Sequence, residues 1–175
     1  MIHPMLLTDQ PGYTPHIGRL LGMMHYARQT TLRSARDLTT AQLDFLPHPE
    51  GNSIGMLLAH VAAVEEGYYL GTVASQEVDW ETPARALGEA GRKVLRGRQL
   101  EHYLSELARV RAQTLEGFLH LDDEWLHAED ANWGEPANTY FRWFHVLEDE
   151  VNHRGQIRLI RKLFPKDLQV TKGAS

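Results

Sequence analysis

The chain of 175 residues contains no cysteine. Disulfide bonds and a cysteine nucleophile are therefore excluded, and any metal site must be built from nitrogen and oxygen ligands. The sequence also lacks a Gly-x-Ser-x-Gly nucleophile elbow and a phosphate-binding glycine loop. Because a chain without cysteine fits a reducing compartment, we expect a cytoplasmic protein.

Long hydrophobic runs and an excess of basic residues are missing too. No apolar stretch approaches the roughly 18 residues that would suggest a membrane span, so we expect no association with a membrane. Residues 1–12 lack a basic start followed by an apolar core, and we expect no signal peptide. The formal net charge is −5, whereas nucleic-acid-binding proteins normally present a basic face. We therefore expect no nucleic-acid partner.

Hydrophobic residues recur with helical spacing in four long segments, at about residues 16–37, 53–71, 100–120 and 138–164. Ser53 and Asn138 are placed to cap the second and the fourth segment. Prolines and glycines interrupt the connections, where we expect loops and one short helix near residues 84–90. Gly155, inside the fourth segment, is expected to permit close packing against a neighbouring helix.

This pattern predicts an all-α protein, an antiparallel four-helix bundle. The length is sufficient for one domain with a hydrophobic core. We expect a single domain over residues 1–175, with its core at about 14–165 and a flexible tail at 166–175. The interior of such a bundle commonly binds metals between facing helices.

Ten histidines are present, and two of them are candidates for metal ligands. His153 follows Asp149 by four residues, so the two side chains share one face of a helix. Imidazole nitrogen and carboxylate oxygen are normal ligands of zinc and its neighbours. His60 lies in the middle of the second segment among apolar and small residues. Two buried imidazoles need polar partners, and one shared metal would supply a partner to both.

The third protein ligand has three candidates. Asp149 ranks first because of its spacing, Glu150 ranks second at three residues before His153, and His145 ranks third at eight residues before it. Alternatively, the acidic run 148–150 is an ordinary helix surface that pairs with Arg142, Arg154 or Arg158. Three protein ligands would leave an open coordination position, as in catalytic sites, and the ligand types admit zinc, nickel, iron or manganese. Aromatic residues are candidates to line a pocket, although most are expected to pack in the core: Tyr68, Tyr69, Trp80, Trp125, Trp133 and Trp143.

Two segments resemble the DinB-like family of bacterial proteins. They are Asn-Ser-Ile-Gly-Met-Leu-Leu-Ala-His60 and, much later, His145-Val-Leu-Glu-Asp-Glu-Val-Asn-His153-Arg-Gly-Gln-Ile. The resemblance covers nearly the whole chain and implies a four-helix bundle, often a homodimer, with a divalent metal held by a histidine triad. Its first and last histidines match His60 and His153. The middle histidine is replaced by Asp149 here, and related thiol-transferase and maleylpyruvate-isomerase-like branches use a carboxylate at the corresponding place.

Characterised relatives include transferases that use low-molecular-weight thiols such as mycothiol or bacillithiol. The resemblance therefore implies a metal-dependent thiol S-transferase that acts in detoxification or stress response on a small-molecule electrophile. A carboxylate of the thiol is a candidate ligand for the basic stretch Arg92, Lys93, Arg96 and Arg98. Two alternatives stay open. One is a metal-dependent hydrolase with Glu148 or Glu150 as base, and the other is a non-catalytic dimeric bundle whose metal is structural or lost.

Overall fold

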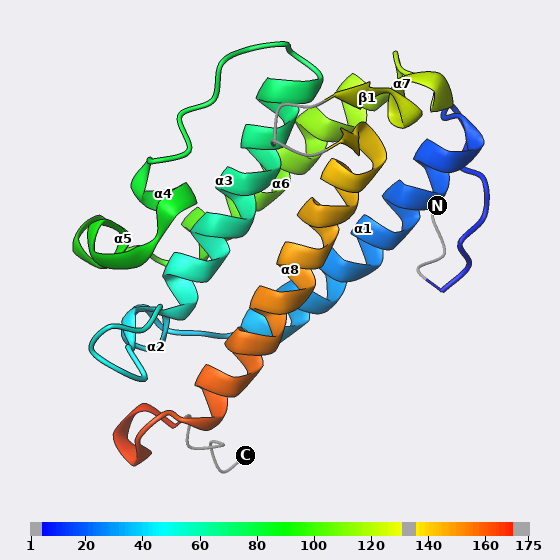
Figure 1. Ribbon diagram of the computed structural model, residues 1–175. Helices are drawn as coiled ribbons and strands as arrows, with labels where there is room; N and C mark the ends of the chain where they lie inside the picture. The colour runs from blue at the N-terminus through cyan, green and yellow to red at the C-terminus, as the bar shows by residue number, and fades with distance from the viewer. Residues whose placement is uncertain (1–4, 131–135, 170–175) are drawn as a thin grey trace.

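Four long helices dominate the fold (Figure 1). The computed structural model describes residues 5–130 and 136–169. Its long helices are α1 (Pro15–Ala35), α3 (Ile54–Thr72), α6 (Leu100–Phe118) and α8 (Thr139–Lys162). The prediction of an all-α protein is confirmed. No described helix is long and apolar enough to cross a membrane.

The helix starts follow local sequence signals. The Ser53 hydroxyl accepts a hydrogen bond from the Met56 backbone N–H at 3.2 Å, and this satisfies one of the free donors at the start of α3. The Asn138 side chain does the same for α8, accepting from the Phe141 N–H at 2.8 Å. Both predicted caps are confirmed.

Helices α1 and α8 run in the same direction. Arg154 donates a hydrogen bond to Thr30, and one turn further along both helices Arg158 donates to Ser34 at 3.0 Å. Residue numbers therefore increase together along this contact. Long connections, such as residues 73–99 between α3 and α6, allow such parallel neighbours, whereas short loops would force antiparallel ones.

Helices α3 and α6 approach each other closely at glycines, and they are also parallel. A Cβ atom at Gly55 would lie 2.7 Å from Tyr103 Oη, and one at Gly117 would lie 2.7 Å from Tyr69 Cε2. The expectation for Gly155 was wrong, because a Cβ atom there would meet no described atom of a neighbouring helix within 4 Å. Gly155 lies on the outer side of α8, so helical spacing alone did not reveal its surroundings.

The connections contain short elements between the predicted breaker residues. Thr39 and Gln42 form a reciprocal capping box at the first of them, and Leu87, with a φ of 58°, separates the next two helices. These elements are α2 (Thr40–Asp44), α4 (Pro83–Ala86), α5 (Gly88–Val94), α7 (Asp123–His127), and the two-residue antiparallel strands β1 (Glu129–Asp130) and β2 (Ala137–Asn138).

The predicted tail begins with a 3₁₀ turn, Lys166–Leu168. The Leu168 carbonyl accepts a hydrogen bond from Gln42 Nε2 at 2.7 Å, and its side chain packs against the core. Residues 170–175 lie outside the described part of the chain.

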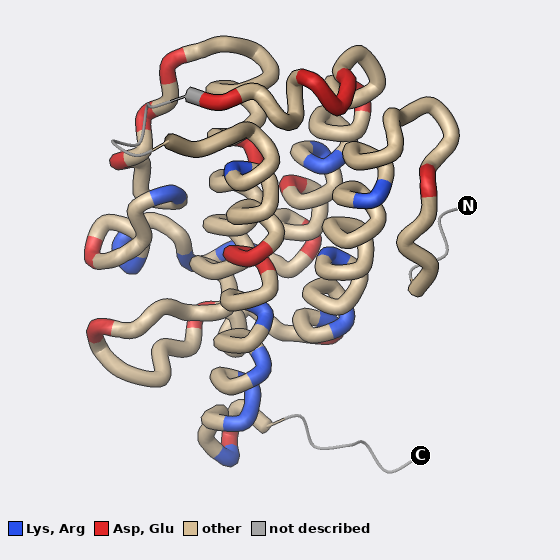
Figure 2. The backbone as a smooth tube through the Cα atoms, turned by 45° about the vertical axis from the view of Figure 1, so that its right-hand side comes forward, with Lys and Arg blue, Asp and Glu red and all other residues tan. Residues whose placement is uncertain are grey.

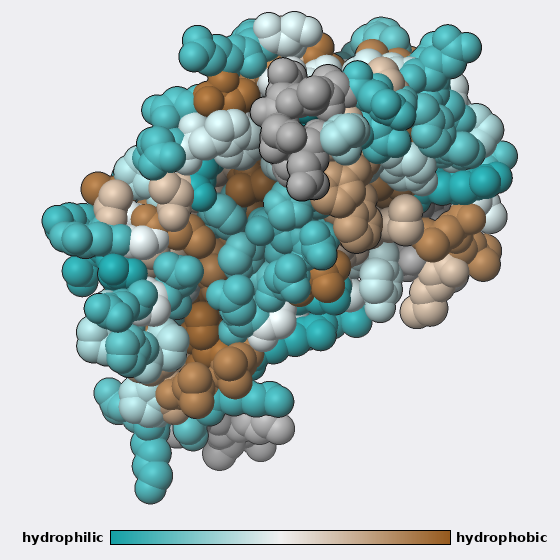
Figure 3. Space-filling view, in the orientation of Figure 1, coloured by the Kyte–Doolittle hydropathy of each residue, from teal (hydrophilic) through white to brown (hydrophobic). Residues whose placement is uncertain are grey.

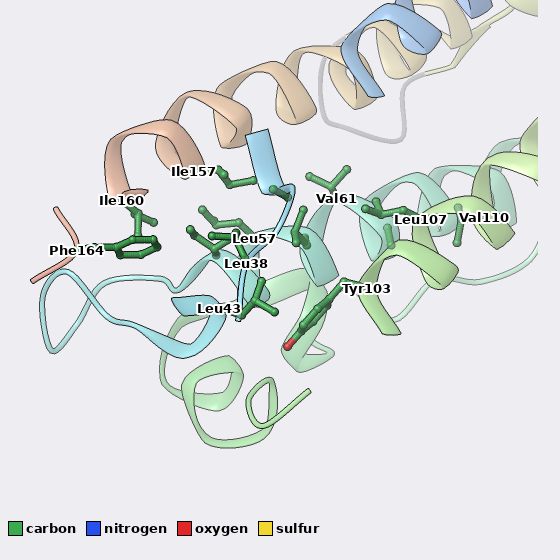
Figure 4. Packing of buried hydrophobic residues seen from close by; sticks show 14 residues of the cluster. Leu38, Leu43, Leu57, Val61, Tyr103, Leu107, Val110, Ile157, Ile160 and Phe164 are labelled. Atoms are coloured by element: carbon green, nitrogen blue, oxygen red, sulfur yellow. The ribbon is translucent and has the colours of Figure 1, made fainter. Parts of the chain in front are cut away.

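Two clusters of buried hydrophobic residues hold the long helices together. One joins α2, α3, α6 and α8, and Figure 4 shows Leu57, Leu107 and Ile157 within it. The other joins α1, α3, α6, α7 and α8 through residues such as Leu20 and Trp143. Because α3 and α8 both contribute to the core, their facing sides are fixed relative to each other.

Candidate metal centre

The three predicted ligands, His60, Asp149 and His153, meet where α3 contacts α8. His153 Nε2 lies 3.2 Å from Asp149 Oδ1, and His60 Nε2 lies 3.6 Å from Asp149 Oδ2. One potential ligand atom from each residue lies within 4.8 Å of the other two. Within residues 5–130 and 136–169, no other group of three such side chains gathers in this way.

The antiparallel course of α3 and α8 produces this meeting. The His60 and His153 rings lie 4.8 Å apart in an edge-to-face arrangement. Further along the contact, the Tyr68 ring of α3 lies 6.1 Å from the His145 ring of α8. Residue numbers increase along α3 while they decrease along the facing side of α8, so residues far apart in the chain face each other.

A backbone carbonyl orients His60. Its Nδ1 atom lies 2.8 Å from the Ala84 carbonyl oxygen in α4, which can only accept a hydrogen bond. Nδ1 therefore carries the proton in neutral His60, and the lone pair on Nε2 is directed to Asp149. This is the arrangement in which a histidine is ready to bind a metal, with its second nitrogen held by an outer partner.

Burial and mutual attraction set the protonation of the site. Burial lowers the pKa of His60, but the nearby Asp149 carboxylate and the backbone carbonyls outweigh it, so this pKa is raised. Burial likewise raises the pKa of Asp149, but its contacts with His153 and His60 outweigh this and hold it well below its usual range. Asp149 is therefore a carboxylate at neutral pH and carries the negative charge that a cation needs.

Two atoms of the cluster indicate that a cation fits. Asp149 Oδ2 and His153 Nδ1 are buried and find no hydrogen-bond partner among the described residues. A buried polar atom without a partner costs free energy. Two imidazoles and one carboxylate form a donor set that divalent zinc, nickel, iron and manganese accept. The side chains are 12–18% exposed, so the cluster can still be reached from solvent.

The structure places the rival third ligands elsewhere. Glu150 is buried on another side of α8, where it contacts Arg28 and Arg111. His145 is partly exposed and lies 3.2 Å from the exposed Glu148 carboxylate. Figure 2 shows the acidic residues halfway along α8, followed by basic residues towards its C-terminus. Of the three candidates, Asp149 alone reaches His60.

The basic stretch lies in and after α5. Arg92 donates to the Glu50 carbonyl at 2.8 Å, and Lys93 pairs with Glu89 at 2.6 Å. Both side chains therefore already interact with groups of the protein itself. Arg96 and Arg98 are exposed residues of the following turn.

Two of the predicted aromatic residues contact each other at α3. Tyr68 is buried, and its ring contacts Trp80 with a centroid distance of 5.3 Å. Burial raises the pKa of Tyr68 far above its usual value, so its hydroxyl remains a hydrogen-bond donor. Trp125 and Trp143 pack against Phe118 in the core, and Trp133 lies outside the described residues.

Two features of the site were not predicted. The Ala84 carbonyl is a backbone group and leaves no signal in the sequence. The buried contacts of Glu150 do leave one, because Arg28, Glu65 and Arg111 are charged residues on otherwise apolar helix faces.

Comparisons with known proteins agree with the fold. The crystal structure of a conserved protein from Enterococcus faecalis is similar with a TM-score of 0.66 over 82% of this chain and 94% of that one, at 20% identity. At that identity the likeness shows the fold alone. No match was found among curated protein sequences. The family model of mycothiol S-transferase matches residues 19–165, a span that includes all three candidate ligands. The chain therefore belongs to the mycothiol S-transferase family of DinB-like proteins.

Proposed function

We propose that this protein is a divalent-metal-dependent S-transferase that joins a low-molecular-weight thiol to a small electrophile. The observation that carries the proposal is the convergence of His60, Asp149 and His153 on one point from two distant segments. Membership of the mycothiol S-transferase family supports the class of substrate.

Each residue of the centre has a role that follows from its surroundings. His60, oriented by the Ala84 carbonyl, presents Nε2, and His153 and ionised Asp149 complete the ligand set. A bound divalent metal would lower the pKa of a thiol and hold it as the thiolate. Three protein ligands leave room for that thiol. Since the chain has no cysteine, the nucleophilic sulfur must come from the substrate.

We assign the buried phenol of Tyr68, eight residues after His60 on α3, as the hydrogen-bond donor to the electrophile. Its raised pKa keeps the proton on the hydroxyl at physiological pH. Donation of a hydrogen bond to an atom that gains negative charge during the attack would favour the transition state. The hydrolase alternative has less support, because Glu150 is held in buried ion pairs.

We further propose that two copies associate through the face formed by α1 and α8. A groove of about 530 Å³ lies there, lined mainly by apolar side chains that include Tyr26, Phe144 and Val151. Met5 and Leu7 of the N-terminal segment form its edge, and hydrophobic residues of that segment are visible at the right of Figure 3. Exposed apolar surface of this kind commonly marks an interface. The wild type is expected to sediment as a dimer and a Phe144→Glu variant as a monomer.

A thiol-conjugation assay tests the proposed activity. The protein is loaded with zinc, nickel, iron or manganese and mixed with mycothiol or bacillithiol and a bromide or epoxide electrophile. We expect conjugation that needs both metal and thiol and that is lost in His153→Ala. Turnover without any thiol would instead support a hydrolase, and zinc binding without turnover on any substrate would support a structural metal. Such a transferase would act in the cytoplasm, where free thiols are kept reduced, in detoxification or stress response.

A further inference from the structure

A buried ionic cluster takes one residue from each of the four long helices. Arg28 comes from α1, Glu65 from α3, Arg111 from α6 and Glu150 from α8. Their side chains are between 1% and 11% exposed, and their two positive and two negative charges balance. Burial raises the pKa of Glu65, but Arg111 and Arg28 outweigh it and lower this pKa to about 2.

Arg28 is the hub of this cluster because its guanidinium reaches three other helices. Nη2 lies 2.7 Å from Glu65 Oε2 in α3, and Nη1 donates to the Leu107 carbonyl of α6 at 2.7 Å. Nε donates to Glu150 Oε1 in α8 at 2.9 Å. Arg111 donates two hydrogen bonds to the Glu65 carboxylate, at 2.7 Å and 3.0 Å, but lies 3.5 Å from Glu150. The short contact that fixes Glu150 therefore comes from Arg28.

The cluster shares its helices with the proposed metal ligands. Glu65 follows His60 by five residues on α3, and Glu150 lies directly after Asp149 on α8. Successive residues point about 100° apart around a helix, so a Glu150 held in the interior turns Asp149 towards the edge that faces α3. At a distance of about 6 Å from the helix axis, a rotation of about 10° would move a carboxylate by about 1 Å. Metal–ligand distances tolerate only about 0.2 Å.

We propose that Arg28 is a positioning residue for the metal centre, because its contact with Glu150 fixes the rotation of α8 and thereby holds Asp149 and His153 opposite His60. This role rests on the proposed metal site. Buried ion pairs contribute little net stability compared with apolar packing, but they can select one arrangement of packed helices. Arg28 contacts neither metal nor substrate in this role.

The test is a titration of the full chain with zinc, followed by cobalt, in wild type and in Arg28→Lys. Lysine keeps the charge but loses the planar fork that reaches three helices. We expect zinc binding about tenfold weaker or more, as for other outer partners of metal ligands, with an altered visible spectrum of bound cobalt and unchanged helical content by circular dichroism.

Two matched variants separate positioning from charge and from burial. Glu148→Gln removes an exposed carboxylate on the other side of Asp149, and Arg111→Lys makes the same replacement at the other arginine of the cluster. Both are expected to keep zinc affinity within about threefold of wild type, well below the loss that removal of an outer partner causes. An Arg111→Lys variant that loses as much affinity as Arg28→Lys would overturn the specific role of Arg28.

Should Arg28→Lys fail to fold, the uncharged pair Arg28→Met with Glu150→Leu takes its place, since apolar replacements of buried ion pairs are commonly tolerated. Wild-type zinc affinity in either folded variant would overturn the proposal. A wild-type chain that binds no zinc would refute the metal site itself, and the positioning role with it. Failure of the positioning role is therefore seen in the variants, whereas failure of the metal site is seen in the wild-type protein.

Discussion

Replacement of Glu65 by glutamine should remove a pH-dependent part of the stability. Glu65 is fully buried, and the guanidiniums of Arg111 and Arg28 lower its pKa from 4.5 to about 2. Such a depressed pKa contributes stability that is fully present above pH 4.5 and is lost as the pH falls through about 2. At about 1.4 kcal/mol for each pH unit, this contribution is about 3 kcal/mol.

The assay is urea unfolding followed by circular dichroism, with chelator present, at several pH values between 7 and 2.5. Glu65→Gln should be about 3 kcal/mol less stable than wild type near neutral pH, a large share of the 5–15 kcal/mol typical of a domain. The difference between the two proteins should shrink in acid, because protonated glutamate resembles glutamine. Other carboxylates titrate in both proteins and cancel in the difference. A difference that stays constant or grows as the pH falls would refute the reasoning.

Three further predictions concern separate parts of the molecule. As the pH is lowered, the zinc affinity, measured by chelator competition, should begin to fall while the pH is still above 6.5, because the raised pKa of His60 lets protons compete for Nε2. A zinc affinity that begins to fall only below pH 6 would contradict this. Gly155→Ala should stabilise by about 1 kcal/mol on helix propensity, whereas Gly117→Ala should destabilise by about 1–3 kcal/mol, since its Cβ would lie 2.7 Å from Tyr69; thermal unfolding distinguishes the two. Ser53→Ala should cost about 1 kcal/mol in urea unfolding, and no loss would mean that the Met56 N–H finds water instead.

Local signals predicted the helices well and their arrangement less well. The caps at Ser53 and Asn138 act within three residues of themselves, so the sequence alone identifies them. The parallel course of α1 with α8 depends on contacts such as Arg158 with Ser34, which no local pattern encodes. Breaker residues correctly marked the connections. Helix α2 was not predicted, because it has five residues and lies within a connection that also contains Pro47 and Pro49.

The candidate site shows the same division. Asp149 and His153 could be paired from a spacing of four, because one helical turn brings them together. Their meeting with His60 was predicted from the expected burial of two imidazoles and from the resemblance to a family, whereas local spacing does not encode how two distant helices pack. The orientation of His60 by Ala84 and the contact of Arg28 with Glu150 needed coordinates, because both join segments far apart in the chain.

The central claim is that His60, Asp149 and His153 bind one divalent metal. Elemental analysis of purified wild type, Asp149→Ala, His153→Ala and the control Glu148→Ala, each incubated with zinc or nickel and then desalted, tests it most directly. We predict about one metal for each chain in wild type and in Glu148→Ala, and loss of the metal in the other two variants. A wild-type protein that retains no metal, or ligand variants that retain all of it, would contradict the account.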